Sequence, residues 1–161
     1  MDKKSDLAKL KEDYKKLQEK YNLPSFEKLN EDFQVEKAAE SETDFVLKEV
    51  RRQITDKFFN YLRFIESILT PHDVPMFVFA ITKTLGQKDR EKLTELYKKI
   101  AKVDIDMIEL DLQYSEEKEA KSIKSYYEIW QEIKKDLLYL VSVIKKNWDV
   151  KIEDNGKSYF G

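Results

Sequence analysis

Residues 93–114 read LTELYKKIAKVDIDMIELDLQY, and this stretch decides the fold. Its apolar residues follow one another at spacings of three and four over three heptads: Leu93, Leu96, Ile100, Val103, Met107, Leu110 and Tyr114. Because residues three and four apart share one face of an α-helix, this seam predicts a long helix buried against other helices. The alternation of Val103, Ile105 and Met107 with aspartates is typical of a strand, but the helical spacing on both sides outweighs it.

Further apolar stripes predict the other helices. A heptad helix at residues 1–22 ends before Pro24, which disfavours helix in the residue that precedes it. Ser25 is a suitable N-cap for a short helix that follows. Helices of similar length joined by short turns pack as antiparallel neighbours. We therefore predict an all-α fold, an antiparallel bundle of three long helices with shorter N-terminal and central helices. The helices expected in the body of the chain are at residues 43–69, 74–85, 88–114 and 116–148.

The segments between and after these helices are less regular. The run at 76–81 is apolar on every side, which predicts a helix buried on several sides, with a strand as the alternative. Gly86 is expected at the C′ position that ends this helix. Residues 34–42 have no period and are expected to form a linker. We predict one helical-bundle domain at residues 1–148, followed by a flexible C-terminal tail at 149–161.

Composition excludes several function classes. The 30 basic and 32 acidic residues nearly cancel, whereas a dedicated duplex-binding domain has a basic excess. The absence of cysteine excludes disulfides, thiolate nucleophiles and cysteine-based zinc sites. The longest apolar run is far shorter than the ~20 residues that span a bilayer, and the first residues lack the apolar region of a secretory signal. We expect a cytoplasmic protein with no membrane partner.

No motif predicts chemistry of its own. The single histidine, His72, excludes a di-metal site built from paired Glu-x-x-His motifs, and the scattered glycines form no phosphate cradle. Carboxylates are dense between residues 104 and 119, but helical spacing spreads them around the helix, so they predict a solvated acidic face or a docking surface for a basic partner. We predict no catalytic residue, no metal ligand and no cofactor, and therefore no enzyme.

Two phenylalanines fall on an outward helix face. In the helix at 43–69, Phe45 and Phe59 lie nearly opposite the core stripe, together with Arg52 and Arg63. Either the N-terminal helices cover these aromatics, or they anchor a protein interface, for which aromatics and arginine are favoured. Two further aromatics in the tail either fold back or dock elsewhere. The candidate interface residues are Phe45, Arg52, Phe59, Arg63, Tyr159 and Phe160.

These observations favour a non-enzymatic helical module for protein–protein interaction or assembly, bound to itself or to another protein. The first alternative is a nucleic-acid-associated factor that uses lysines and arginines of the helices at 43–69 and 88–114. The second is a small-molecule-binding or enzymatic bundle with a pocket where His72, Tyr61 and Arg63 approach the central helix.

Two segments resemble known sequences. NYLRFIE at residues 60–66 and YSEEKEA at residues 114–120 are similar to stretches of uncharacterised small all-helical archaeal proteins. The resemblance implies a cytoplasmic archaeal protein. It implies no activity, ligand or site residue.

Overall fold

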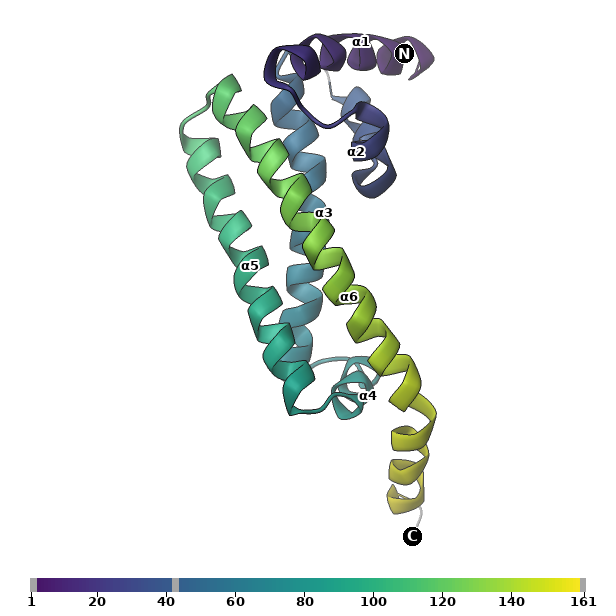
Figure 1. Ribbon diagram of the computed structural model, residues 1–161. Helices are drawn as coiled ribbons and strands as arrows, with labels where there is room; N and C mark the ends of the chain where they lie inside the picture. Colours follow the sequence, from purple (N-terminus) through teal and green to yellow (C-terminus); the bar gives the residue numbers. More distant parts are fainter. Residues whose placement is uncertain (1–2, 42–43, 160–161) are drawn as a thin grey trace. The chain divides into compact units, whose positions relative to one another are not determined.

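The computed structural model describes the backbone of residues 3–41 and 44–159, and the side chains of residues 4–41 and 44–148 (Figure 1). The predicted all-α fold is confirmed, because these residues form helices and no strand. In chain order the elements are α1 (Lys3–Tyr21), α2 (Phe26–Phe33), the 3₁₀-helix η1 (Val35–Glu40), α3 (Val46–Leu69), α4 (Met76–Thr84), α5 (Gln87–Leu112) and α6 (Glu116–Tyr159).

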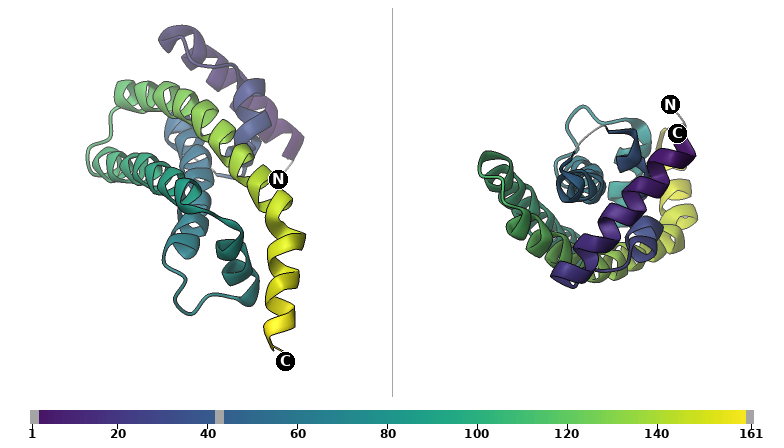
Figure 2. Two further views of the ribbon diagram at one scale, coloured as in Figure 1. Left: turned by 60° about the horizontal axis from the view of Figure 1, so that its bottom comes forward. Right: turned by 90° about the horizontal axis from the view of Figure 1, so that it is seen from above.

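The chain divides into two compact units. Unit 1 comprises Met1–Phe59 and Val103–Trp130, and unit 2 comprises Asn60–Lys102 and Gln131–Gly161. Each unit contains one stretch of α3, α5 and α6, and within each unit α5 runs opposite to the other two (Figures 1 and 2). The predicted antiparallel arrangement of three long helices is thus confirmed. Because all three helices continue through both units, this division does not test the predicted single domain.

The seam that predicted α5 forms its buried side. Five of its residues are buried: Leu93, Leu96, Ile100, Val103 and Leu110. Met107 is half-buried, and Tyr114 is exposed beyond the end of the helix. Local capping also follows the prediction, since the Ser25 hydroxyl accepts a hydrogen bond from the Lys28 N–H at 3.3 Å. Thr43, the first residue of the helix predicted at 43–69, lies outside the described residues.

The linker expected at residues 34–42 is wrong over most of its length. Val35–Glu40 forms η1, with Val35 and Ala38 buried. Residues three apart lie on the same side of a 3₁₀-helix, so this pair points into unit 1 together. Gln34 separates α2 from η1 with a left-handed backbone (φ 54°), and the Asn30 side chain accepts a hydrogen bond from the Glu36 N–H at 2.9 Å.

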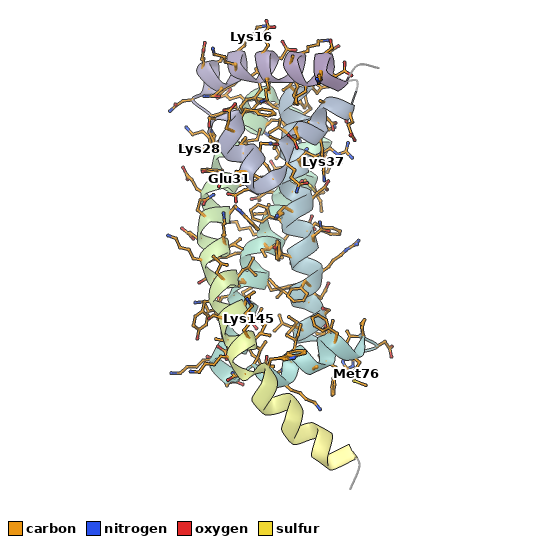
Figure 3. The ribbon with its side chains drawn as sticks, turned by 90° about the vertical axis from the view of Figure 1, so that its right-hand side faces the viewer. Lys16, Lys28, Glu31, Lys37, Met76 and Lys145 are labelled. Carbon is orange, nitrogen blue, oxygen red and sulfur yellow. The ribbon has the colours of Figure 1, made fainter. Side chains whose placement is uncertain are left out.

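The burial predicted for the central helix is also wrong. Met76 and Phe77 of α4 are 80% and 62% exposed, and Figure 3 shows Met76 projecting from the helix. This short helix packs mainly through its C-terminal end, where Ile81 is buried. Gly86 takes the predicted C′ position, directly after the C-cap Leu85, but without the left-handed backbone that is usual there. The Gly86 N–H instead donates to the Asp89 carboxylate at 3.0 Å, at the start of α5.

Helix α6 extends past its predicted end at Trp148. Its backbone is helical to Tyr159, so the tail expected at 149–161 begins as a continuation of the helix. Asn155 and Gly156 each cost an α-helix at most about 1 kcal/mol, which does not suffice to end it. The side chains of Tyr159 and Phe160 lie outside the described part, so their predicted role as interface residues stays a prediction.

Helix α1 is held to the rest of unit 1 by buried and polar contacts. Tyr14 is fully buried, its ring meets the Phe26 ring edge-on at 5.7 Å, and its hydroxyl donates to the Pro24 carbonyl at 2.8 Å. Burial raises the pKa of the Tyr14 hydroxyl, so it remains a neutral donor. At the end of the helix, Lys20 and Tyr21 both donate to the Glu116 carboxylate of α6.

Removing the Tyr14 hydroxyl tests this attachment. We expect Tyr14→Phe to lower the free energy of unfolding by about 1 kcal/mol, because the Pro24 carbonyl loses its donor. Denaturant titration followed by circular dichroism measures the change. Tyr127→Phe is the matched control, since the half-buried Tyr127 makes no hydrogen bond through its hydroxyl within the described part. Equal effects of the two substitutions would contradict the role of the Tyr14 hydrogen bond.

Candidate protein-binding surface

The C-terminal stretch of α5 in unit 1 exposes a row of apolar side chains. Ile105, Ile108 and Leu112 are 66%, 55% and 79% exposed. At about 100° per residue the three lie within an arc of roughly 60° on one face of the helix. The opposite face carries the buried Val103 and Leu110. This stretch of α5 is therefore apolar on two opposite sides, of which the described residues cover only one.

Two further exposed aromatic rings meet just beyond the end of α5. Tyr114 follows the helix, and its ring meets that of Phe45 at a centroid distance of 4.8 Å in an edge-on geometry. Both rings remain exposed, Phe45 by half. Burial and the nearby charges of Glu116 and Glu119 raise the pKa of the Tyr114 hydroxyl. The α5 face is the name used below for Ile105, Ile108, Leu112, Tyr114 and Phe45.

Carboxylates border the apolar row on both sides. By helical position, Asp104 and Asp111 lie on one side, and Asp106 and Glu109 lie on the other. Glu109 has a cation nearby, since its carboxylate is 3.9 Å from the Lys118 amine in an exposed pair that water screens. The α5 face is therefore an apolar strip with a negatively charged border.

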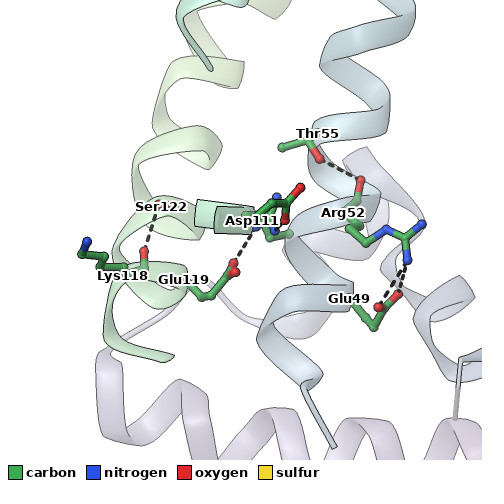
Figure 4. A network of polar contacts seen from close by, with 8 residues as sticks. Glu49, Arg52, Thr55, Asp111, Lys118, Glu119 and Ser122 are labelled. Carbon is green, nitrogen blue, oxygen red and sulfur yellow. Dashed lines mark hydrogen bonds and ion pairs between the residues drawn. The ribbon is translucent and has the colours of Figure 1, made fainter. Parts of the chain in front are cut away.

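A buried ion-pair network holds this end of α5 in place. Arg51 of α3 donates through Nε to Glu119 of α6 and through Nη2 to Asp111 of α5, both at 2.6 Å (Figure 4). Arg51 and Glu119 are fully buried, whereas Asp111 is half-exposed. One guanidinium thus joins the three long helices within unit 1, directly beneath the carboxylates that border the α5 face.

The network keeps the arginine charged. Burial by itself lowers the pKa of Arg51, but the hydrogen bonds and negative charges of Glu119 and Asp111 raise it by more. The pairing is incomplete, because Arg51 Nη1 and Glu119 Oε1 are buried and make no hydrogen bond within the described part. The network therefore depends on both partners of the buried pair.

The four described residues predicted for the interface lie on α3 or directly before it. Phe45 belongs to the α5 face, and the N-terminal helices leave both Phe45 and Phe59 exposed. Arg52 is exposed and lies 3.4 Å from Glu49, one turn away on α3. Arg63 is exposed on the stretch of α3 that belongs to unit 2, whereas Phe45, Arg52 and Phe59 belong to unit 1.

Sequence reasoning missed most of the α5 face and the network beneath it. Ile105, Ile108 and Leu112 repeat the 3-4 spacing in the same stretch as the stronger seam, and that second row is the signal that could have identified them. Arg51 lies at the edge of the apolar stripe of α3, and Glu119 precedes the buried Ile123 by one turn. A charged residue on a core stripe predicts a buried ion pair.

Unit 1 also contains an open hollow of about 820 Å³ between α1, η1 and the start of α3. Carboxylates of Asp6, Asp13 and Glu36 are among the groups that line it. His72, the expected centre of a pocket, is exposed in the turn before α4 and does not line this hollow.

No protein-family model, curated protein or solved structure matches the chain. The resemblance to archaeal helical proteins therefore stays a prediction. Within the described residues, no helix combines the length and apolarity that crossing a bilayer requires.

Proposed function

We propose that this chain is a non-enzymatic protein-interaction module that binds a partner on the α5 face. The supporting observation is the row Ile105, Ile108 and Leu112, which is more than half exposed on a helix whose other side is core. Contiguous exposed apolar groups rimmed by polar residues mark interaction sites. Covering them stabilises a complex by roughly 25 cal/mol for each Å² of apolar surface removed from water.

A helix is the partner shape that suits this surface. The row runs along one helix with the 3-4 spacing of a coiled-coil seam, so a second helix laid beside it can place its own apolar side chains between these residues. The exposed Phe45–Tyr114 pair just beyond the end of α5 offers further aromatic contact area, which interfaces favour.

The charges on this surface favour a protein partner over a nucleic acid. Asp106 and Glu109 beside the row would repel phosphates, whereas a protein can present lysines to them. Arg51, one of the arginines considered for nucleic-acid binding, is fully buried with two carboxylates. The α5 face also fits a catalytic site poorly. Catalysis needs polar groups that converge on a cavity, whereas the polar groups beside this row lie along a convex helix.

A single charged substitution in the row tests the proposal. We expect Ile108→Lys to weaken partner binding by at least about tenfold, because it places an ammonium group in the apolar contact. Stability should change by less than about 0.5 kcal/mol, since Ile108 is exposed. The measurement is quantitative mass spectrometry of proteins retained from the source cells by each immobilised chain.

Ser125→Lys is the matched control, because it adds the same charge at an exposed position of α6 in unit 1. We expect the control to retain the same partner as the unsubstituted chain. If Ile108→Lys retained that partner equally well, the α5 face would not be the binding surface, and the proposed function would be wrong.

A further inference from the structure

A second exposed apolar row lies on α6 in unit 2. Leu138 and Val141 are 62% and 46% exposed, while Ile133 and Leu140 on the other side of the helix are buried. Lys145 follows Val141 by one turn in the same row and is exposed, as Figure 3 shows. This row has the spacing three then four, as the row of the α5 face does.

One side of this second row is positively charged. Lys135 and Lys146 are exposed beside it, and neither forms an ion pair within the described part of the chain. The acidic residues of this stretch lie on another side of α6, where Asp136 pairs with Lys92 of α5 at 3.0 Å. The α6 face is the name used below for Lys135, Leu138, Val141, Lys145 and Lys146.

We propose that the partner of the α5 face is the α6 face of a second copy of this chain. The inference rests on the proposed function and names its partner. Both faces are helix surfaces whose side chains recur at the same intervals of three and four residues, so the two helices can interdigitate side by side. The stem of Lys145 can lie along apolar surface while its ammonium group reaches a carboxylate.

Charge decides which faces meet. Two α5 faces brought together would oppose Asp106 and Glu109 to their own copies, and two α6 faces would oppose lysines. Pairing an α5 face with an α6 face instead places carboxylates against Lys135 and Lys146 along one border of the contact. Such a contact uses different surfaces on the two copies, so every pair leaves one face of each kind open for a further copy.

The experiment uses two variants of the full chain, each with one face removed. Ile108→Lys removes the α5 face, and Leu138→Glu removes the α6 face; both positions are exposed, so the fold tolerates the changes. In sedimentation velocity, the unsubstituted chain is expected to associate with concentration. Each variant alone is expected to bind itself at least about tenfold more weakly. An equimolar mixture of the two is expected to form a heterodimer and nothing larger, because each variant retains the face that the other lacks.

Ionic strength and the control variant complete the test. Raising salt from about 0.05 M to about 0.5 M should weaken association of the unsubstituted chain, because exposed charge pairs are screened. Ser125→Lys should associate as the unsubstituted chain does.

Two results would overturn the inference while leaving the proposed function intact. One is that the unsubstituted chain stays monomeric. The other is that Leu138→Glu associates normally while Ile108→Lys does not. Normal association of Ile108→Lys, together with unchanged partner retention by that variant, would overturn both.

Discussion

Glu119→Gln is expected to lower the free energy of unfolding by about 3–5 kcal/mol, because it removes the charge that faces the fully buried guanidinium of Arg51. Asp111 cannot replace it, since it is half-exposed and bonds a different nitrogen of the same side chain. Denaturant titration with circular dichroism and fluorescence measures the loss. Glu117→Gln removes a carboxylate two residues earlier in α6 at an exposed position, and should change stability by less than about 0.5 kcal/mol.

Replacing both residues of the buried pair separates the contribution of charge to the free energy of unfolding from the contribution of packing. Because desolvation of two ions offsets most of their attraction, Arg51→Met combined with Glu119→Leu should recover most or all of the stability lost in Glu119→Gln. The two orphaned atoms, Arg51 Nη1 and Glu119 Oε1, disappear in this variant, which favours the recovery further. If the double variant were as unstable as Glu119→Gln, the buried pair would stabilise the fold by more than the mutual balance of its two charges.

The helices could be predicted from the sequence because their signal is local. Seven apolar residues between Leu93 and Tyr114 repeat at helical spacing, and five of them are buried on α5. The burial of α4 could not be predicted in this way. An apolar run at 76–81 shows that a helix can be buried on every side, whereas actual burial depends on which elements lie beside it. Met76 and Phe77 are mostly exposed, although the Phe77 ring meets that of Trp148 of α6 at 5.9 Å.

The candidate site shows the same division between local and long-range information. Phe45 was found because its position opposite the α3 core stripe is visible in the spacing. The partners of Arg51 were not, because Asp111 and Glu119 are 60 and 68 residues away and no local spacing connects them. The row from Ile105 to Leu112 was present in the sequence, but the buried seam in the same stretch accounted for the helix and left the second row without a role.

An aromatic cluster joins α2, α3 and α6 in unit 1. The Phe58 ring lies 5.5 Å from that of Trp130 and 6.2 Å from that of Tyr126, and Trp130 also meets Phe33 at 5.6 Å. Phe58 is 2% exposed. These rings pack in tilted or edge-on geometries that add about 0.5–1.5 kcal/mol for each pair beyond the apolar area they bury. Phe58 therefore contributes both packing volume and ring contacts on α3.

Truncating Phe58 is expected to be as costly as breaking the ion pair. Phe58→Ala should lower the free energy of unfolding by about 3–5 kcal/mol, because it leaves a cavity beside the Tyr126 and Trp130 rings of α6. Phe58→Leu keeps much of the volume and should cost distinctly less, within about 1.5 kcal/mol. Phe45→Ala is the matched control, since the same atoms are removed from a half-exposed ring and the loss should stay below about 1 kcal/mol. Denaturant titration gives the three values, and the near-ultraviolet circular dichroism of the native state reports whether Trp130 keeps its packing. Equal losses from Phe58→Ala and Phe45→Ala would contradict the burial of Phe58 against α6.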